Sequence, residues 1–387
     1  MRIGVPREAE HEPRVAVTPD SVKRFTGLGA TVAVASGAGE RSRIPDAHFA
    51  EAGAEIVSSS ADALRDADLV LKVERPSGEE IDQIREGAVV VAIMDPYGND
   101  GPLQHMAGRG LVAFAMELMP RITRAQSMDV LSSQANLGGY QAVIDAAEVY
   151  DRAIPMMMTA AGTVPAAKAF VMGAGVAGLQ AIATARRLGA AVSATDVRPA
   201  AKEQVASLGA KFIAVEDDEF KAAETAGGYA KEMSEEYRKK QAELIADHIS
   251  KQDIVITTAL IPGRPAPRLI TREMLESMKP GSVVVDLAVE RGGNVEGSEP
   301  DKVVEVGPVR VIGYRNMPGR IAASASLLYG KNLYTFVESV MVDKETKALS
   351  INWEDDIVKA TALTRDGKVV HPNFAPAAET QDNGGQE

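Results

Sequence analysis

The stretch AFVMGAGVAGLQAIATARRLGAAVSATDVR, residues 169–198, decides the fold of this chain. It begins with an apolar run, continues with Gly173-x-Gly175-x-x-Gly178 and an amphipathic segment, and ends with a second apolar run before Asp196. An apolar strand, a glycine-rich turn, a helix and an acidic residue about 20 positions further on are the fingerprint of a dinucleotide-binding βαβ unit. The stretch therefore predicts a strand, a helix and a second parallel strand around a nucleotide.

Each residue of this fingerprint has a physical task. Gly173 permits the tight turn, and Gly175 lets the backbone approach a pyrophosphate at the helix N-terminus, where unpaired N–H groups point. Gly178 allows close packing of helix and strand. Asp196 would accept hydrogen bonds from the adenosine ribose and repel a 2′-phosphate, which favours NAD over NADP, although the nearby Arg198 could pair with a phosphate. The alternative is a glycine turn in an α/β unit that binds no nucleotide.

The same alternation of short apolar runs and amphipathic segments extends over most of the chain and predicts βαβ units with mostly parallel sheets. Long helices are expected at 127–152 and 325–341. Arg365-Asp366-Gly367, flanked by strands at Ala360–Thr364 and Lys368–His371, indicates a hairpin in a tail that returns to the first domain. The expected strands are Arg2–Val5, Thr31–Ala35, Glu55–Val57, Asp68–Val73, Ala88–Met94 and Leu111–Met116, then Ala169–Met172, Ala191–Thr195, Lys211–Val215, Ile254–Thr258, Val283–Leu287 and Val309–Tyr314.

This pattern predicts an α/β protein with two Rossmann-like, doubly wound domains joined by a long crossing helix. The first domain would comprise residues 1–126 and 325–387, and the second, which binds the nucleotide, residues 127–324. The cofactor is expected in the cleft between them. In the first domain, Gly37-Ala38-Gly39 follows a strand but has Ser42 at the position of a third glycine, so we interpret it as a turn.

Composition narrows the function. The 387 residues carry 42 Lys and Arg against 54 Asp and Glu, a formal net charge of −12, which disfavours nucleic acid and anionic membranes as partners. The chain has no cysteine, which excludes disulfides, a thiolate nucleophile and iron–sulfur sites. The start is charged and lacks the apolar segment of a secretory signal. The stretch 153–185 is the one candidate for a membrane span, but its prolines and glycines favour a strand, a turn and a helix.

A second group of polar residues lies in MELMPRITRAQSMDVLSS, residues 116–133, between a predicted strand and the crossing helix. Ligands of α/β sheets bind beyond the carboxyl ends of the strands. This loop could therefore contact a substrate or the nicotinamide. The alternative is a capped helix start with a solvated loop. The polar residues are Arg121, Arg124, Gln126, Asp129, Ser132 and Ser133.

Several long segments closely resemble the NAD(H)-binding component of proton-translocating nicotinamide nucleotide transhydrogenase, and the similarity extends over nearly the whole chain. Alanine dehydrogenase is the related family with the same two-domain plan. The segments are RITRAQSMD, AGTVPAAKAFVMGAGVAGLQAIATARRLGA, ATDVR, ETAGGYAKEMSEEYRKKQ, TTALIPGRPAP and VVVDLAVERGGN.

The resemblance implies roles for single residues. Arg121 would hold the nicotinamide carboxamide, and Gln126 would reach toward the nicotinamide that the partner component presents. Asp129 and Ser132 would fix the loop and the ring. Gly228 and Tyr229 resemble the tip of a mobile loop that closes over the nucleotide, and a Gly-Gly pair in a charged helical stretch is also consistent with a simple helix break. The other residues implied in the cofactor site are Val176, Val197, Arg198, Gln241 and Leu260.

The implied reaction is direct hydride transfer from NADH here to NADP⁺ on a partner subunit, coupled to proton translocation. Transfer between two nicotinamides moves only a hydride, whereas oxidation of an alcohol or amine also needs a positioned acid or base. None of the five histidines lies in a catalytic context, and none has metal-ligand spacing with carboxylates, so no bound metal is expected.

The resemblance also implies a homodimer that lies peripherally on the cytoplasmic face of the membrane. Membrane subunits would carry the proton channel and the NADP(H) site, because this chain ends in a polar tail without apolar spans. Two alternatives are an alanine-dehydrogenase-like enzyme and a non-catalytic NAD-binding sensor. Arg14 and Lys72 resemble the substrate-carboxylate ligands of alanine dehydrogenase. However, Asp95-Pro96-Tyr97 stands where that family has its catalytic His, and Glu290 where it uses Asp.

Overall fold

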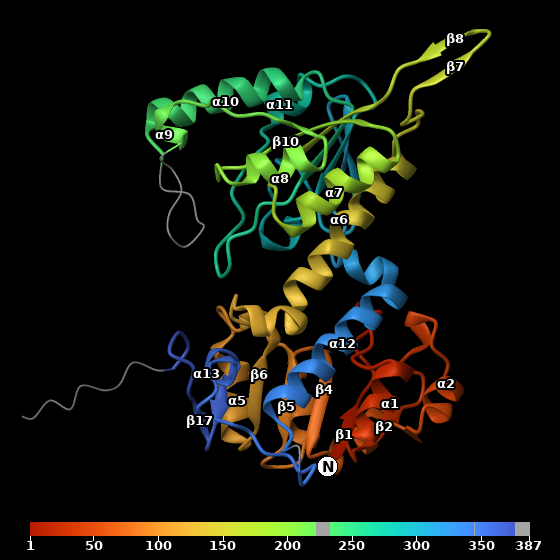
Figure 1. Cartoon of the computed structure of the whole chain (residues 1–387), viewed down its shortest axis with the longest axis vertical. Coiled ribbons are helices and arrows are strands. Elements are labelled where there is room, and N and C mark those ends of the chain that lie inside the picture. The colour runs from red at the N-terminus through yellow and green to blue at the C-terminus, as the bar shows by residue number, and fades with distance from the viewer. Residues whose placement is uncertain (222–232, 344, 376–387) are drawn as a thin grey trace, which may run out of the picture. The chain divides into compact units, whose positions relative to one another are not determined.

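The structure, a computed structural model, describes residues 1–221, 233–343 and 345–375 (Figure 1). They form two compact units, Met1–Ser133 with Ala322–Glu387, and Gln134–Ile321. Helix α6 (Val130–Val149) begins in the first unit and continues into the second. The domain limits expected from the sequence, 126/127 and 324/325, stay a prediction. Within the described residues, no helix is both long and apolar enough to cross a membrane.

The first unit contains a six-stranded parallel sheet in the order β3-β2-β1-β4-β5-β6 (Figure 1). The chain order reverses between β1 and β4, which is the position where doubly wound sheets bind ligands. The strands are β1 Arg2–Val5, β2 Thr31–Ala35, β3 Glu55–Val57, β4 Leu69–Glu74, β5 Val89–Ile93 and β6 Val112–Ala115.

Helices cover both faces of this sheet because its central strands are apolar on both sides. Along β4, Leu69 and Leu71 belong to one buried cluster and Val70 to the other. The helices of the unit are α1 Pro19–Gly27, α2 Asp46–Glu51, α3 Ser60–Arg65, α4 Gly78–Gln83, α5 Asp100–Gly108, α12 Ala322–Val340 and α13 Asp356–Thr361, with 3₁₀ turns η1 Glu40–Ser42, η2 Met116–Leu118 and η3 Thr123–Met128.

The C-terminal segment packs on the first unit, as the sequence predicted. The hydroxyl of Tyr329 on α12 is buried and donates to the Lys72 carbonyl oxygen at 2.8 Å. Thr364 Oγ1 accepts from the Ala113 N–H at 3.0 Å and donates to the Leu111 carbonyl at 2.7 Å. The predicted hairpin is present as β16 (Thr364–Arg365) and β17 (Lys368–Val369).

The second unit contains a seven-stranded sheet in the order β11-β10-β9-β12-β13-β15-β14, parallel except for β14. Its chain order reverses between β9 and β12. The strands are β9 Lys168–Met172, β10 Ala191–Thr195, β11 Lys211–Phe212, β12 Ile254–Thr257, β13 Val283–Asp286, β14 Val303–Val306 and β15 Val309–Ile312. The helices are α7 Val176–Arg187, α8 Ala201–Ser207, α9 Asp218–Lys221, α10 Glu235–Ile249 and α11 Arg272–Glu276, with η4 Val289–Arg291 and η5 Met317–Ile321.

Several elements differ from the sequence expectation, among them β11, which ends at Phe212 and not at Val215. The hairpin of β7 (Met157–Thr159) and β8 (Gly162–Val164) was not predicted, because both strands are fully exposed and show no burial pattern. Strand β14 was also missed. The expected strand 360–364 was wrong at its start, because α13 extends to Thr361 and only Thr364 and Arg365 pair as β16.

Candidate functional site

The glycine-rich turn of the second unit is built for close packing. Gly173 follows β9 with φ +107°, a conformation that side chains disfavour. A Cβ on Gly178 would lie 1.8 Å from the Gly173 carbonyl oxygen, so only glycine lets α7 approach the turn. Thr258, directly after β12, donates from Oγ1 to that same carbonyl at 3.1 Å. The turn is therefore fixed from both strands that flank the reversal of chain order.

The N-terminus of α7 is open toward solvent. A Cβ on Gly175, the N-cap residue, would meet no atom within 4 Å, and no side chain caps the helix. Val176, the first helical residue, is 41% exposed. The unpaired N–H groups of a first turn favour an anion, and here a pyrophosphate would have room to reach them. The residues present thus fit NAD(H) at this turn.

Asp196, at the end of β10, forms a compact unit with Arg198. The carboxylate accepts from the Ala174 N–H at 2.7 Å and from the Arg198 N–H at 2.9 Å. The Arg198 guanidinium adds two bonds, from Nε at 2.9 Å and from Nη2 at 3.0 Å. The Asp196 side chain is only 7% exposed and that of Arg198 35%. The acidic residue of the fingerprint therefore lies directly beside the glycine turn.

The other predicted cofactor residues of this unit have different surroundings. Val197 and Leu260 are exposed, as a surface that receives a ligand would be. The Gln241 side chain spans two elements, accepting from the Val215 N–H at 2.8 Å and donating to Thr195 Oγ1 at 3.4 Å. Gly228 and Tyr229 lie outside the described residues. The assignment of all these residues to the cofactor site stays a prediction.

Asn294, to which the sequence analysis assigned no role, supports the loop that follows β12. It is buried, and its amide donates to the carbonyls of Ala259 and Pro267 at 2.9 and 2.8 Å while accepting from the Ala259 N–H at 3.1 Å. Its own N–H donates to the buried carboxylate of Asp286. Asn294 thereby holds the loop that carries Leu260. The signal for this role in the sequence was a polar residue, Asn294, at the end of the glycine-containing segment VVVDLAVERGGN.

In the first unit, the loop 116–133 holds the second predicted group. Arg121 and Gln126 are exposed. Asp129 accepts from the Ser132 N–H at 2.9 Å and from its hydroxyl at 2.5 Å, so it caps the start of α6. Ser133 donates from Oγ to the side-chain oxygen of Asn332 at 2.7 Å. The loop is therefore capped and anchored, while Arg121 and Gln126 are exposed.

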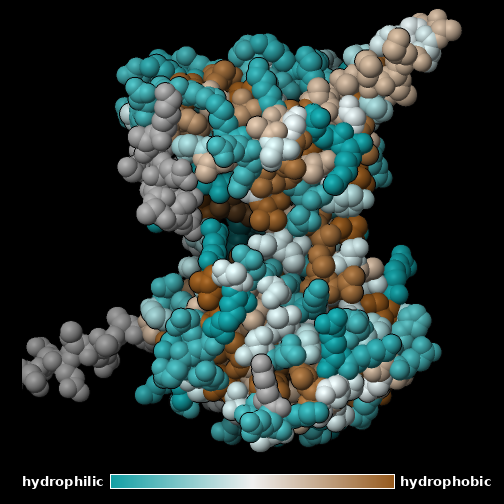
Figure 2. Space-filling view, in the orientation of Figure 1, coloured by the Kyte–Doolittle hydropathy of each residue, from teal (hydrophilic) through white to brown (hydrophobic). Residues whose placement is uncertain are grey.

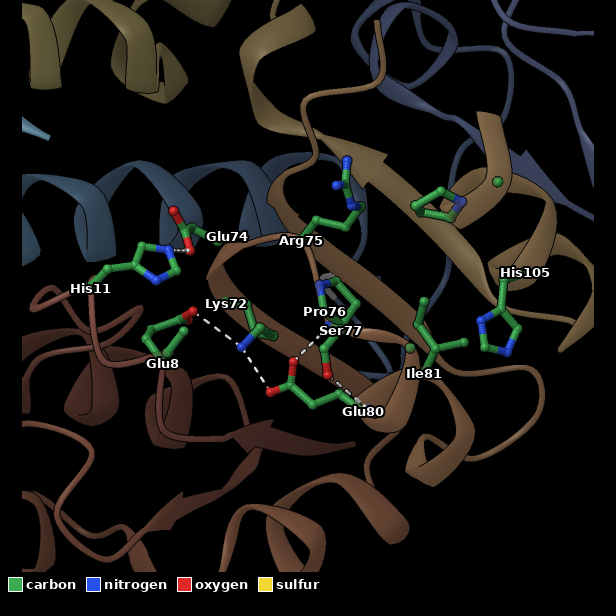
Figure 3. Close-up of a pocket in the computed structure, with 14 residues that line it drawn as sticks. Glu8, His11, Lys72, Glu74, Arg75, Pro76, Ser77, Glu80, Ile81 and His105 are labelled. Atoms are coloured by element: carbon green, nitrogen blue, oxygen red, sulfur yellow. Dashed lines mark hydrogen bonds and ion pairs between the residues drawn. The ribbon is translucent and has the colours of Figure 1, made fainter. Parts of the chain in front are cut away.

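A cavity of 510 Å³ lies in the first unit, where loops follow β1 and β4 (Figure 3). Lys72 points between two carboxylates, 3.1 Å from Glu8 and 2.9 Å from Glu80. Burial raises the pKa of Glu8 although Lys72 opposes the shift, and the two carboxylates raise the pKa of Lys72 against its burial. The charge of Lys72 is thus already balanced inside the protein.

Arg14, the second residue that resembles a substrate-carboxylate ligand, is likewise paired. Its Nε and Nη2 donate to the buried carboxylate of Glu12 at 2.8 and 2.6 Å. Asp95 has φ +46°, and its N–H donates to Glu117 at 2.5 Å. Glu290 accepts from the Asn316 N–H at 2.8 Å. Each of these positions has a hydrogen-bond partner within its own unit.

All five histidines are described, and none lies beside the glycine turn or Asp196. Burial lowers the pKa of His248 and His371, so both favour the neutral form. Within the described ranges, no group of three or more His, Asp or Glu side chains could hold a metal ion. His48 is exposed, and the other pairs are His11–Glu74 at 2.8 Å, His105–Asp82 at 3.0 Å, His248–Ser193 at 2.8 Å and His371 with the Ala360 carbonyl at 3.2 Å.

Comparisons with known proteins agree over nearly the whole chain. The family Alanine dehydrogenase/PNT matches with its N-terminal domain at residues 4–138 and its C-terminal domain at 142–372. The chain is 56% identical to the first section of the NAD(P) transhydrogenase alpha subunit of Rhodospirillum rubrum, over 96% of this chain and 98% of that one. It is 30% identical to an alanine dehydrogenase of Halomonas elongata over 97% and 96%. The crystal structure of a transhydrogenase from Sinorhizobium meliloti, 67% identical, matches with a TM-score of 0.88 over 96% and 100%.

Proposed function

Because the chain belongs to the alanine dehydrogenase/PNT family, we propose that it is the NAD(H)-binding subunit of a proton-translocating transhydrogenase. The reaction is direct hydride transfer between NADH on this chain and NADP⁺ on a partner subunit, coupled to proton translocation across the membrane. The observation that carries the proposal is the nucleotide cradle of the second unit, in which the glycine turn, the open N-terminus of α7 and Asp196 lie together.

This cradle holds the nucleotide through the chain's own groups. The first N–H groups of α7 bind the pyrophosphate beside Gly175, and Asp196 accepts hydrogen bonds from the adenosine ribose. Nicotinamide, when bound, supplies or receives the hydride. In the first unit, Arg121 holds the carboxamide and Gln126 faces the partner's nicotinamide. Asp129 and Ser132 keep the loop in one conformation through their two hydrogen bonds.

Hydride transfer between two nicotinamides releases no proton, so the protein has to align the rings and exclude water rather than supply an acid or base. The loop 116–133 suits this task because it carries Arg, Gln, Ser and Asp side chains and no His. The histidines that the chain has are paired elsewhere or exposed.

An amino-acid dehydrogenase activity is disfavoured by the charges of the first unit. Binding of a substrate carboxylate would need a cation without an internal partner. Lys72 has two carboxylate partners and Arg14 forms a two-point pair with Glu12. Replacing these partners with a substrate would leave buried carboxylates uncompensated, which is costly.

The chain acts as a homodimer and lies on the cytoplasmic face of the membrane through partner subunits. The β7–β8 hairpin projects from the second unit with tan, apolar side chains in Figure 2, and Met158 is 78% exposed. An exposed apolar arm of this kind favours burial against another protein surface, here a second copy. Replacement of Met156, Met157 and Met158 by Thr is expected to shift the mass in sedimentation from dimer to monomer.

Stopped-flow absorbance tests the central proposal. The purified chain with NADH is mixed with a transhydrogenase NADP(H)-binding component loaded with NADP⁺, and a second arm supplies pyruvate and ammonia without that component. We expect rapid oxidation of NADH only with the partner. Oxidation with pyruvate alone would make the chain an amino-acid dehydrogenase, and NADH binding without turnover in either arm would make it a sensor.

A further inference from the structure

The hydrogen-bonding capacity of Asp196 is filled by the protein itself. A carboxylate has about four lone-pair sites, two on each oxygen. Oδ1 accepts from the backbone N–H and from Nε of Arg198, both at 2.9 Å, and Oδ2 accepts from the Ala174 N–H at 2.7 Å and Arg198 Nη2 at 3.0 Å. A ribose hydroxyl that donates to this carboxylate must therefore replace one of these four donors.

The donors are not equally replaceable. Two are backbone N–H groups, and the one from Ala174 belongs to the glycine turn that Thr258 also fixes. The other two belong to the guanidinium of Arg198, which also donates from Nη2 to the Ala174 carbonyl at 3.2 Å. This side chain is 35% exposed and can rotate into solvent. A ribose hydroxyl can thus replace the guanidinium as a donor to the Asp196 carboxylate, while the two backbone hydrogen bonds remain.

The position of the guanidinium also determines the local charge near the 2′ position of the ribose. When it is paired with Asp196, it offsets the negative charge that repels a 2′-phosphate. When displaced, it stays attached to the same turn and can meet a phosphate with charge-assisted hydrogen bonds. The next cation along the chain, Lys202, is already paired with Glu216 at 2.5 Å.

We propose that Arg198 is a specificity-determining residue for the nucleotide, which covers Asp196 in the ligand-free chain, yields to the ribose hydroxyls of NADH, and pairs with the 2′-phosphate of NADPH. This inference rests on the proposed function. It means that Arg198 limits discrimination between the nucleotides, because it competes weakly with NADH and gives NADPH a favourable contact at the 2′-phosphate.

Titration of the full chain with NADH and NADPH, followed by nucleotide fluorescence, tests the inference, with NADPH also used to displace NADH. For Arg198→Ala we expect an NADH Kd within about fivefold of wild type, since the guanidinium leaves the carboxylate when NADH binds and the two backbone N–H groups remain. The NADPH Kd should rise by about tenfold or more, because a charge-assisted contact is lost. Arg198→Lys keeps the charge but not the planar guanidinium. Its NADPH Kd should therefore lie between the wild-type value and that of Arg198→Ala.

Arg187→Ala is the matched control. It removes one positive charge from the exposed end of α7 and should leave the ratio of the two Kd values unchanged. Thermal unfolding of each variant establishes that the unit remains folded.

Three outcomes overturn the inference. If Arg198→Ala weakened the binding of NADH and NADPH equally, Arg198 would support the site as a whole and not select between the nucleotides. An unchanged ratio would give it no part in selectivity. Failure of NADPH to displace NADH from the wild-type chain at any concentration would show that Arg198 does not pair with the phosphate. Failure of the wild-type chain to bind NADH would instead contradict the proposed function.

Discussion

The guanidinium of Arg124 and the carboxylate of Asp355 form a two-point ion pair across 231 positions of sequence, with both N–O distances at 2.8 Å. Asp355 also caps α13 by accepting from the Ile357 N–H at 2.8 Å. The pair therefore ties the loop 116–133 to the C-terminal segment within the first unit. Arg124, which the sequence grouped with possible cofactor contacts, thus has a structural role in holding the loop.

Arg124→Ala is expected to destabilise the chain by less than about 1 kcal/mol, because Arg124 is half exposed and solvent screens the pair. Its hydrogen bonds hold the pKa of Asp355 below the usual value. A lowered carboxyl pKa stabilises the folded state above the unfolded pKa, about 3.9, and this contribution is lost as pH falls through the folded pKa. Urea midpoints should thus differ most at neutral pH.

The control is Arg124→Lys, which retains the charge and should recover part of the difference. A gap between wild type and Arg124→Ala that widens below pH 4 would contradict this account of the pair.

Gly175→Ala should leave stability unchanged but abolish most NADH binding. The backbone φ of Gly175 is −77°, which alanine accepts, and the added Cβ would meet no protein atom within 4 Å. The proposed function places the pyrophosphate in that space, at the helix N-terminus. Thermal unfolding and NADH fluorescence titration measure the two effects. Wild-type affinity in this variant would remove the pyrophosphate from the N-terminus of α7.

Gly178→Ala, three positions along the same motif, should behave differently. Its Cβ would lie 1.8 Å from the Gly173 carbonyl oxygen, so the helix or the turn must move. Overpacking of this kind costs about 1–3 kcal/mol or more. A lower urea midpoint should therefore accompany weaker NADH binding. Full stability in Gly178→Ala would contradict the close contact of α7 with the turn.

Lys72→Met should destabilise the first unit by about 3–5 kcal/mol, because it leaves Glu8 buried without its cation. Burial already raises the pKa of Glu8. A carboxyl with a raised pKa is tolerated while protonated and becomes costly as pH rises through its folded pKa, so the loss should be larger at pH 8 than at pH 5.5. Urea denaturation at the two values measures it.

The double variant Glu8→Gln with Lys72→Met removes both charges and should lose less stability than Lys72→Met alone. Equal losses in the two variants, with no dependence on pH, would mean that the lysine acts through packing and not through its charge.

The fold was predictable where burial leaves a continuous apolar run. Strands such as Thr31–Ala35 and Ala191–Thr195 have the predicted limits, because the sheets are covered on both faces. The exposed β7–β8 hairpin left no such pattern. In the site, the spacing of glycines and Asp196 predicted their proximity, because one βαβ unit contains them all.

The partners of these residues were not predictable from spacing. Lys72 meets Glu8, which lies 64 positions earlier, only because β1 and β4 are neighbours in the sheet. Asn294 reaches Ala259 and Pro267 across the carboxyl ends of two strands. Even for Arg198, two residues from Asp196, the sequence indicated a phosphate ligand. It did not predict that Arg198 pairs with the Asp196 carboxylate.

Gln126→Ala should slow hydride transfer by at least about tenfold, equivalent to 1.4 kcal/mol in the barrier, while NADH binds as before. Gln126 is exposed on η3, whereas the neighbouring Ala125 and Met128 are buried and hold the loop in place. The loss would therefore come from alignment of the two nicotinamides, which carries the rate when no proton is transferred. Stopped-flow single turnovers with the NADP⁺-loaded partner measure the step, and NADH titration measures binding.

Ser127→Ala, an exposed neighbour whose carbonyl still accepts from Asn332 at 2.9 Å, serves as the control and should transfer hydride at the wild-type rate. Equal slowing in both variants would assign the effect to the loop as a whole rather than to the Gln126 side chain.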